Sequence, residues 1–453
     1  MRRVVKVSRI RIIITIIVVV LTTLLTGCTG KEPNEIAYVV ALGIDSTDDD
    51  NYKITIQYAN TTQISGGASE SGGKAGSEIV DNVTIEAPNI YAGVGLANNI
   101  VSKSFSMSHA KLIVFSKEIA EKGVKDMIET LVRSEEIRPD VFIAVANTTA
   151  NDYLTSVNPE MEVNPAQYYQ LIYQKNQLVG IPDGQLREFF TGLYTDNYDS
   201  ILPVAGVIDG SGGNSQNDDK GQSKDSQNEG SEGSSESLDS FESKSSNENE
   251  KEKDAEKNTS KYEYDIKNYV GGETAIEKKN KAEAIGAAVF EKDKMVGELG
   301  EVETEICKML KGDYTYSYLT YYNNDTPDIP ITVKTTQQKK PKYKIDTDKK
   351  TVDIELYIES DLYSLPADYN VENKIEDFER DVANYTSSAC TEFINNFTKK
   401  YNSDILKLNE KIKYKFLTNN QYNWFKKNVG WSEYKFSVCT NFKVRRTGLI
   451  VRE

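Results

Sequence analysis

The sequence predicts an α+β fold in which three mixed α/β domains, with mostly antiparallel or mixed sheets and packed helices, follow one another in an elongated arrangement. Three observations predict it. Short apolar or alternating runs bounded by turn residues recur along the chain, as in strands. Segments with apolar residues every three or four positions lie between them, as in helices. The length, 453 residues, favours two or three domains over one.

Residues 1–27 are typical of a bacterial lipoprotein signal peptide. Five basic residues precede an Ile/Val/Leu/Thr run from Ile12 to Leu25. This run would reach only about 21 Å as a helix, short of the roughly 30 Å hydrocarbon core, so an export signal is favoured over a signal anchor. Leu25-Thr26-Gly27-Cys28 resembles a lipobox. The resemblance implies cleavage between Gly27 and Cys28 and a diacylglycerol on the Cys28 thiol, the one covalent group that we expect.

The N-terminal domain is predicted over residues 28–150. Ile36 to Ile44 and Tyr52 to Tyr58 are expected to form a hairpin. Its turn contains Asp45, Asp48, Asp49 and Asp50 but lacks the glycine and glutamate spacing of a calcium loop, so a solvated turn is favoured. Ala110 to Phe115 and Val141 to Ala146 are expected to be strands, with an amphipathic helix over Lys117 to Arg133 between them.

The middle domain is predicted over residues 151–310 and the C-terminal domain over 311–453. Expected elements are a hairpin of Ala284–Phe290 and Lys294–Leu299, a helix over Glu301–Leu310, and a second hairpin of Lys342–Ile345 and Val352–Ile358. A long helix at about 373–401 follows from an apolar stripe, with Cys390 beside it. Tyr434 to Val444 alternates as a final strand, which directs Cys439 away from the apolar face.

Two tracts are predicted to be disordered. Ser65 to Ser77 is rich in Gly and Ser, and Ser211 to Ser260 contains thirteen serines and thirteen acidic residues. Such segments bury too little apolar surface to offset their ordering entropy. The longer tract interrupts the middle domain at 211–260, and we favour a tolerated surface insertion over a cation sponge or a spacer.

Charge and cysteine content exclude several classes of protein. The net charge is −15, and without residues 1–27 it is about −20, which argues against nucleic acid and against electrostatic docking on anionic lipid. Besides Cys28, only Cys307, Cys390 and Cys439 are present. Three thiols make no disulfide framework, so we expect buried side chains first and a single bridge second.

The sequence predicts no enzyme. His109 is the single histidine, so neither a two-histidine metal site nor a histidine relay can form, and no metal site is expected. Ser108 is adjacent, but neighbours on a strand point to opposite faces, which argues against a nucleophile and base pair. His109 is therefore interpreted as a hydrogen-bonding residue at a strand start. No Walker loop, Rossmann glycine pattern, CxxC or HExxH is present.

Four blocks of sequence resemble the Ger(x)C-type lipoproteins, the C subunits of the spore germinant receptors of endospore-forming bacteria. They are "GCTGKEPNEIAYVVALGID" with Cys28, Gly43 and Asp45, "SMSHAKLIVF…" with His109 and Arg133, "IGAAVFEKDKMVGELGEVET", and Trp431 with "VCTNFKVRRTGLI", which includes Gly448. The blocks occur in the family's order. In a further family stretch, after the long helix, only Asp404 is retained.

The resemblance implies a lipid-anchored accessory subunit that is needed for nutrient-triggered spore germination. It implies integral-membrane A and B subunits as partners, no nucleic acid, and a place on the outer face of the spore inner membrane. Gly43, Asp45, His109, Arg133, Trp431 and Gly448 are the structural or interaction residues that match the family. A solute-binding lipoprotein that captures the nutrient directly is the alternative, and a cell-wall hydrolase is a third hypothesis that the missing catalytic residues disfavour.

Overall fold

The computed structural model describes most of the chain outside its N-terminal segment and its polar tracts. The described residues are 13–18, 35–49, 51–59, 80–159, 162, 164–174, 180–195, 197–208, 268–274, 280–323, 326–364, 374–401 and 403–446. Gly27, Cys28, Gly448 and both predicted disordered tracts lie outside them. No helix of the described residues is long and apolar enough to cross a membrane.

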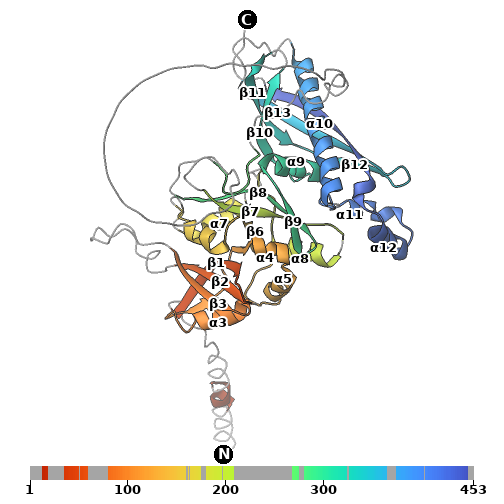
Figure 1. Cartoon of the computed structure of the whole chain (residues 1–453). Coiled ribbons are helices and arrows are strands. Elements are labelled where there is room, and N and C mark those ends of the chain that lie inside the picture. Colours follow the sequence, from red (N-terminus) through yellow and green to blue (C-terminus); the bar gives the residue numbers. More distant parts are fainter. Residues whose placement is uncertain are drawn as a thin grey trace, which may run out of the picture.

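The first sheet is mixed and has nine strands in the order β3-β2-β1-β5-β6-β7-β8-β9, with β4 paired to β1 (Figure 1). A parallel centre of β1, β5, β6 and β7 is flanked by antiparallel β2 and β3 on one side and by β8 and β9 on the other. The strands are β1 (Ile36–Ser46), β2 (Tyr52–Ala59), β3 (Val80–Ala87), β4 (Ser104–Ser106), β5 (Leu112–Ser116), β6 (Phe142–Ala146), β7 (Ile201–Val207), β8 (Ala282–Glu291) and β9 (Lys294–Leu299).

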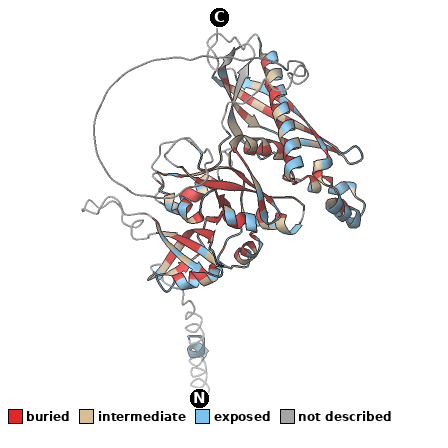
Figure 2. Ribbon diagram, viewed as in Figure 1, coloured by how far each residue is buried: buried red, intermediate tan, exposed pale blue. Residues whose placement is uncertain are grey.

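Helices cover both faces of this sheet. Because side chains alternate along a strand, Ile113 and Phe115 of β5 join one apolar cluster, whereas Leu112 and Val114 join another on the opposite face. The first cluster includes residues of α3 (Ile90–Ala97), α4 (Lys117–Lys122), α5 (Lys125–Val132) and α8 (Leu186–Thr195). The second includes α6 (Ala150–Ser156) and α7 (Pro165–Gln174). The central strands are therefore buried on both faces, as Figure 2 shows.

The second sheet has five strands, in the order β10-β11-β13-β12 with β14 parallel to β13. They are β10 (Tyr316–Asn323), β11 (Thr326–Gln337), β12 (Lys342–Asp346), β13 (Thr351–Ser364) and β14 (Lys435–Arg446). The long helix α10 (Ile375–Tyr401) packs across this sheet (Figure 1). Shorter elements are α9 (Glu301–Lys311), α11 (Leu408–Ile412), α12 (Asn419–Asn428) and the 3₁₀ turns Lys413–Lys415 and Trp431–Glu433.

One apolar cluster joins the two sheets. It contains Ile201 and Val289 of the first sheet, Cys307 of α9, Leu356 of the second sheet and Phe397 of α10. Helix α9 therefore packs between the sheets as a shared part of the core. Figure 1 shows the second sheet beyond one end of the first, which makes the described chain elongated.

The predicted α+β class is confirmed, and so are the three predicted hairpins (β1–β2, β8–β9 and β12–β13), the helix after β9 and the final strand. Residues 28–150 and 151–310 both contribute strands to the first sheet, with β6 and β7 as parallel neighbours across residue 150. The division into three domains stays a prediction.

Several local predictions were wrong. The helix expected over Lys117 to Arg133 is two helices, because Gly123 has φ +123° and the Val124 N–H donates to the Asp293 carbonyl. Asp45 lies in a strand and is buried, so it does not belong to a solvated turn. Cys439 is exposed, so the expectation that all three thiols are buried was wrong for it, although its position on the face of β14 away from the core was predicted correctly. Cys307 and Cys390 are buried as expected, and all three thiols are free.

Candidate functional site

Gly43 and Asp45 together hold helix α6 against the first sheet. A Cβ on Gly43 would lie 3.0 Å from Leu154 Cδ1 and 3.1 Å from the Ala150 Cβ, so glycine is what lets the helix approach β1. The Asp45 carboxylate accepts the N–H groups of Ala150 at 2.6 Å and Asn151 at 3.0 Å. It satisfies two N–H groups that the first turn of the helix leaves free. Burial nevertheless raises the pKa of Asp45.

His109 and Arg133 are both exposed on the surface. His109 is in a turn before β5, and its Nδ1 lies 3.0 Å from Ser108 Oγ, so the expectation that these neighbours point apart was wrong. The ring also makes an edge contact with Tyr38 at 4.8 Å. Arg133 ends α5 and pairs with Glu129 at 3.1 Å, with its side chain 80% exposed. The structure does not bring His109 and Arg133 together with Trp431 into one site.

Trp431 is a core residue. Its side chain is 4% exposed and packs against Phe425 and Tyr434, with ring centroids 6.0 and 4.8 Å apart. Its Nε1 has no hydrogen-bond partner among the described residues. The family-matched tryptophan therefore anchors the turn before β14 to the shared apolar cluster.

Asp404 lies where the C-terminal segment meets the first sheet. Its backbone N–H donates to Asp199 Oδ2 at 2.9 Å, and its carbonyl accepts the Asp199 N–H at 3.2 Å. Its carboxylate accepts the N–H groups of Leu408 at 2.7 Å and Asn409 at 2.8 Å, at the start of α11. One residue thus joins α11 to the loop before β7. Asp199 carried no signal in the sequence.

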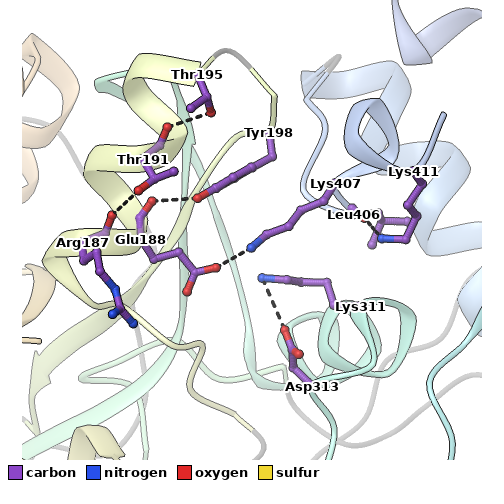
Figure 3. Close-up of polar contacts among 10 residues, drawn as sticks. All are labelled: Arg187, Glu188, Thr191, Thr195, Tyr198, Lys311, Asp313, Leu406, Lys407 and Lys411. Carbon is purple, nitrogen blue, oxygen red and sulfur yellow. Dashed lines mark hydrogen bonds and ion pairs between the residues drawn. The ribbon is translucent and has the colours of Figure 1, made fainter. Parts of the chain in front are cut away.

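A salt bridge, drawn in Figure 3, lies beside this contact. We name the two together the junction, which consists of Asp199 and Asp404 with Glu188, Tyr198, Lys311 and Lys407. Lys407 Nζ lies 2.5 Å from Glu188 Oε1 of α8 and 4.3 Å from the centroid of the Tyr198 ring. The Tyr198 hydroxyl donates to the Glu188 carbonyl at 2.9 Å, and Lys311 of α9 approaches Asp313 at 3.8 Å. Lys407 has φ +57°, a left-handed conformation that is unfavourable for a lysine and that the surrounding contacts hold.

Burial and neighbouring charges shift the pKa values of acidic and basic side chains at the junction. Burial raises the pKa of Asp404 to about 7, with the neighbouring Asp199 acting in the same direction. Burial also acts to raise the pKa of Glu188, but the Lys407 hydrogen bond and the charges of Lys311 and Lys407 hold it below its usual value. Burial lowers the pKa of Lys411. The junction is therefore a set of coupled charges.

The junction has no room for a ligand. The hollow that Glu188, Tyr198, Lys311 and Lys407 help to line has a volume of only about 10 Å³, which is about one water. The junction's hydrogen bonds and salt bridge connect the C-terminal segment to the first sheet.

A larger pocket, of about 900 Å³, lies between α9 and α10. Apolar side chains line much of it, among them Val302, Ile306, Met309, Phe393 and Phe397. Burial raises the pKa of Glu305, which also lines it and accepts the Ser317 hydroxyl at 2.6 Å, to about 7. The volume lies in the range of small-molecule sites. Among the residues that the structure describes, no group of three His, Cys, Asp or Glu side chains could hold a metal ion.

Comparison with known proteins identifies the family from both halves of the chain. The model "Spore germination protein N-terminal domain" matches residues 30–207, and "Spore germination B3/GerAC like, C-terminal" matches residues 285–448. These two matches cover strands of both sheets.

Curated relatives from Bacillus subtilis (strain 168) include spore germination protein KC, 26% identical over 174 residues, and the putative spore germination protein YfkR, 28% identical over 145 residues. The alignments cover 35% and 32% of this chain and 42% and 37% of those relatives, so the chain matches less than half of their length. A solved structure titled "Crystal Structure of the GerBC protein" aligns with a TM-score of 0.48 and 15% identity, over 89% of this chain and 96% of that one. The two family models and the curated relatives agree, and the chain belongs to the Ger(x)C family of spore germination proteins.

Proposed function

We propose that this protein is the lipid-anchored accessory, or C, subunit of a spore germinant receptor, and that it is needed for nutrient-triggered germination. It is tethered by a diacylglycerol on Cys28 to the outer face of the spore inner membrane, beside integral-membrane A and B subunits. The observation that carries the proposal is the match of both halves of the chain to spore germination family models.

The proposed mode of action is protein contact rather than catalysis. The polar clusters that the structure describes are used in capping helices and joining the sheets, as at Asp45, Asp404 and the Glu188–Lys407 pair. The shared apolar cluster and the junction connect the two sheets. A subunit that works between partners needs this kind of connection.

Replacing Cys28 by alanine should release the protein from the membrane and slow nutrient germination. Without the thiol no acyl chain is attached, and since two or more chains hold a protein effectively permanently, about nine tenths or more of it should leave the membrane fraction. Membrane retention is measured by immunoblot of spore fractions, and germination by the fall in optical density after nutrient addition.

Cys439→Ala is the matched control, because Cys439 is a free, exposed thiol in β14 and its loss should change neither readout. Normal retention of the Cys28→Ala protein would contradict the tether. Normal germination in spores that lack the whole chain would contradict the proposed role itself.

Direct nutrient capture is the second candidate, and the 900 Å³ pocket between α9 and α10 favours it. Calorimetry of residues 28–453 with amino acids, sugars and nucleosides separates the two. The accessory role predicts no saturable heat. Saturable binding that Ala389→Trp abolishes would favour capture, because Ala389 lines the pocket and an indole there would fill it.

A further inference from the structure

Residues 408–428 form a projection, which we name the α12 lobe, whose charge is opposite to that of the whole chain. The lobe and the preceding Lys407 contain six lysines and a single acidic residue, Glu410, in a chain of net charge −15. Lys407 pairs with Glu188, and the ammonium groups of Lys411, Lys415 and Lys426 donate to oxygens of Leu406, Ile345 and Asn197. Lys413 and Lys427 are exposed and make no hydrogen bond or ion pair among the described residues. Figure 1 shows α12 at the edge of the molecule, beyond the end of α10. The basic patch that the net charge of the sequence argued against is therefore present locally.

Large apolar side chains are exposed on the same lobe. Leu417 is 94% exposed, Tyr414 81% and Trp424 65%, whereas the other tryptophan of the chain, Trp431, is 4% exposed. Figure 2 shows α12 as mostly exposed. Leu417 and Trp424 border an open hollow of about 660 Å³, whose lining also includes the less exposed rings of Phe416 and Phe425. Exposed apolar groups gathered in this way mark an interaction surface.

The lobe is held in place by its opposite side. The Tyr422 hydroxyl donates to Asn197 Oδ1 at 3.2 Å, and Lys426 Nζ donates to the same oxygen at 3.1 Å. Tyr422 and Phe425 are buried, and the Thr418 hydroxyl caps α12 by accepting the Gln421 N–H. The fold therefore uses one face of α12 for packing and leaves Leu417 and Trp424 largely exposed.

We propose that the exposed face of the α12 lobe docks on an anionic lipid bilayer. Its composition favours this occupant: tryptophan and tyrosine settle at the headgroup level, leucine enters the acyl boundary, and lysines are attracted to anionic headgroups. The acidic remainder of the chain is repelled by the same surface, so this face is the one that approaches it. The contact adds a second attachment to the proposed lipid on Cys28 and does not depend on that lipid.

The test uses residues 28–453 with Cys28→Ser, so that no acyl chain contributes, and vesicles of phosphatidylcholine with or without an equal share of phosphatidylglycerol. The protein should sediment with the anionic vesicles and not with the zwitterionic ones, and 0.5 M NaCl should release it. Tryptophan emission should shift to the blue on binding, and Trp424→Phe should remove that shift, because the buried Trp431 has no water to lose.

Leu417→Ser with Trp424→Ser should weaken vesicle binding at least about tenfold, and Lys413→Gln with Lys427→Gln severalfold. Matched controls are Tyr363→Ser, which is a 60% exposed aromatic residue of β13, and Lys349→Gln, which lies in the β12–β13 turn; neither should change binding. No association with anionic vesicles, or equal binding by the lobe variants and the parent, would overturn the proposal. An acidic protein surface or a second copy of the chain would then be the occupant. None of these readouts depends on spore germination, so the outcome is separate from the proposed function.

Discussion

Replacing Gly43 by valine should destabilise the region where α6 packs on β1 by about 3 kcal/mol, the upper end of the usual cost of overpacking. Gly43 lies in the sheet centre, opposite Thr55 of β2 and Val114 of β5. A Cβ would already touch Leu154 and Ala150 at 3.0 and 3.1 Å, and the two further methyl groups of valine have no space. Hydrogen exchange of the α6 amides should become roughly a hundredfold faster, since about 1.4 kcal/mol corresponds to a factor of ten.

Two other glycine substitutions serve as controls for Gly43→Val. Gly43→Ala should cost less, because only the Cβ has to be accommodated. Gly95→Ala in α3 should be neutral or stabilise by up to about 1 kcal/mol, because nothing lies within 4 Å of a Cβ there and alanine is the better helix former. Unchanged α6 exchange in Gly43→Val would show that the helix can move away without cost, and would contradict the close-approach explanation of this glycine.

Asp404 should make the stability of the junction fall as the pH rises from about 4 to about 7. Burial raises its pKa in the folded protein to about 7, above the usual value of 3.8, so in this window the folded state binds more protons than the unfolded state. Stability is therefore lost as the pH rises through the folded pKa. At about 1.4 kcal/mol per pKa unit, the loss has an upper limit of roughly 4 kcal/mol.

The measurement is the urea midpoint between pH 5 and pH 8 for the parent and for Asp404→Asn. The amide cannot titrate, so the variant should have a flatter profile while keeping one oxygen for the N–H groups of α11. Asp404→Ala, which leaves the Leu408 and Asn409 N–H groups without their acceptor, does not titrate either and should be less stable than Asp404→Asn at every pH, by about 2 kcal/mol. Asp199, Lys411, Tyr343 and Tyr422 face the same carboxylate. Burial raises the pKa of both tyrosines above its usual value near 10, so they stay neutral in this range, and a parallel profile in Asp404→Asn would show that the slope does not come from Asp404.

Local hydrophobic patterns predicted the strands and helices correctly where one face of the element packs against the core. Val352, Ile354, Leu356 and Ile358 alternate in the sequence and are all buried in β13, and the hairpin of β8 and β9 lies where its apolar runs placed it. These elements could be predicted because periodicity records burial directly. The break at Gly123 could not, because it depends on Asp293, which is 170 positions away in the sequence.

Some site residues could likewise be identified from the sequence, whereas others could be identified only from the structure. The sequence identified Gly43, Asp45 and Trp431 through a family pattern, and the structure supplies the reasons: close approach of α6, capping of α6, and core packing before β14. Asp199, Glu188 and Lys407 carried no signal, because a lone acid or lysine on a polar stretch resembles any solvated surface residue. Their contacts with one another form only when the fold brings α8, the loop before β7 and the start of α11 together.

The sequence by itself determined the α+β class, most strands, the long helix and the family of this protein, because each of these is written in short-range periodicity or in contiguous blocks of residues. Tertiary structure alone decided that residues on both sides of position 150 share one sheet, that Asp404 joins the C-terminal segment to that sheet, and that Leu417 and Trp424 are exposed on a lysine-rich lobe. The physical reason is that pairing between distant strands, desolvation of a carboxylate and exposure of a side chain are set by neighbours in space, which composition and spacing do not specify.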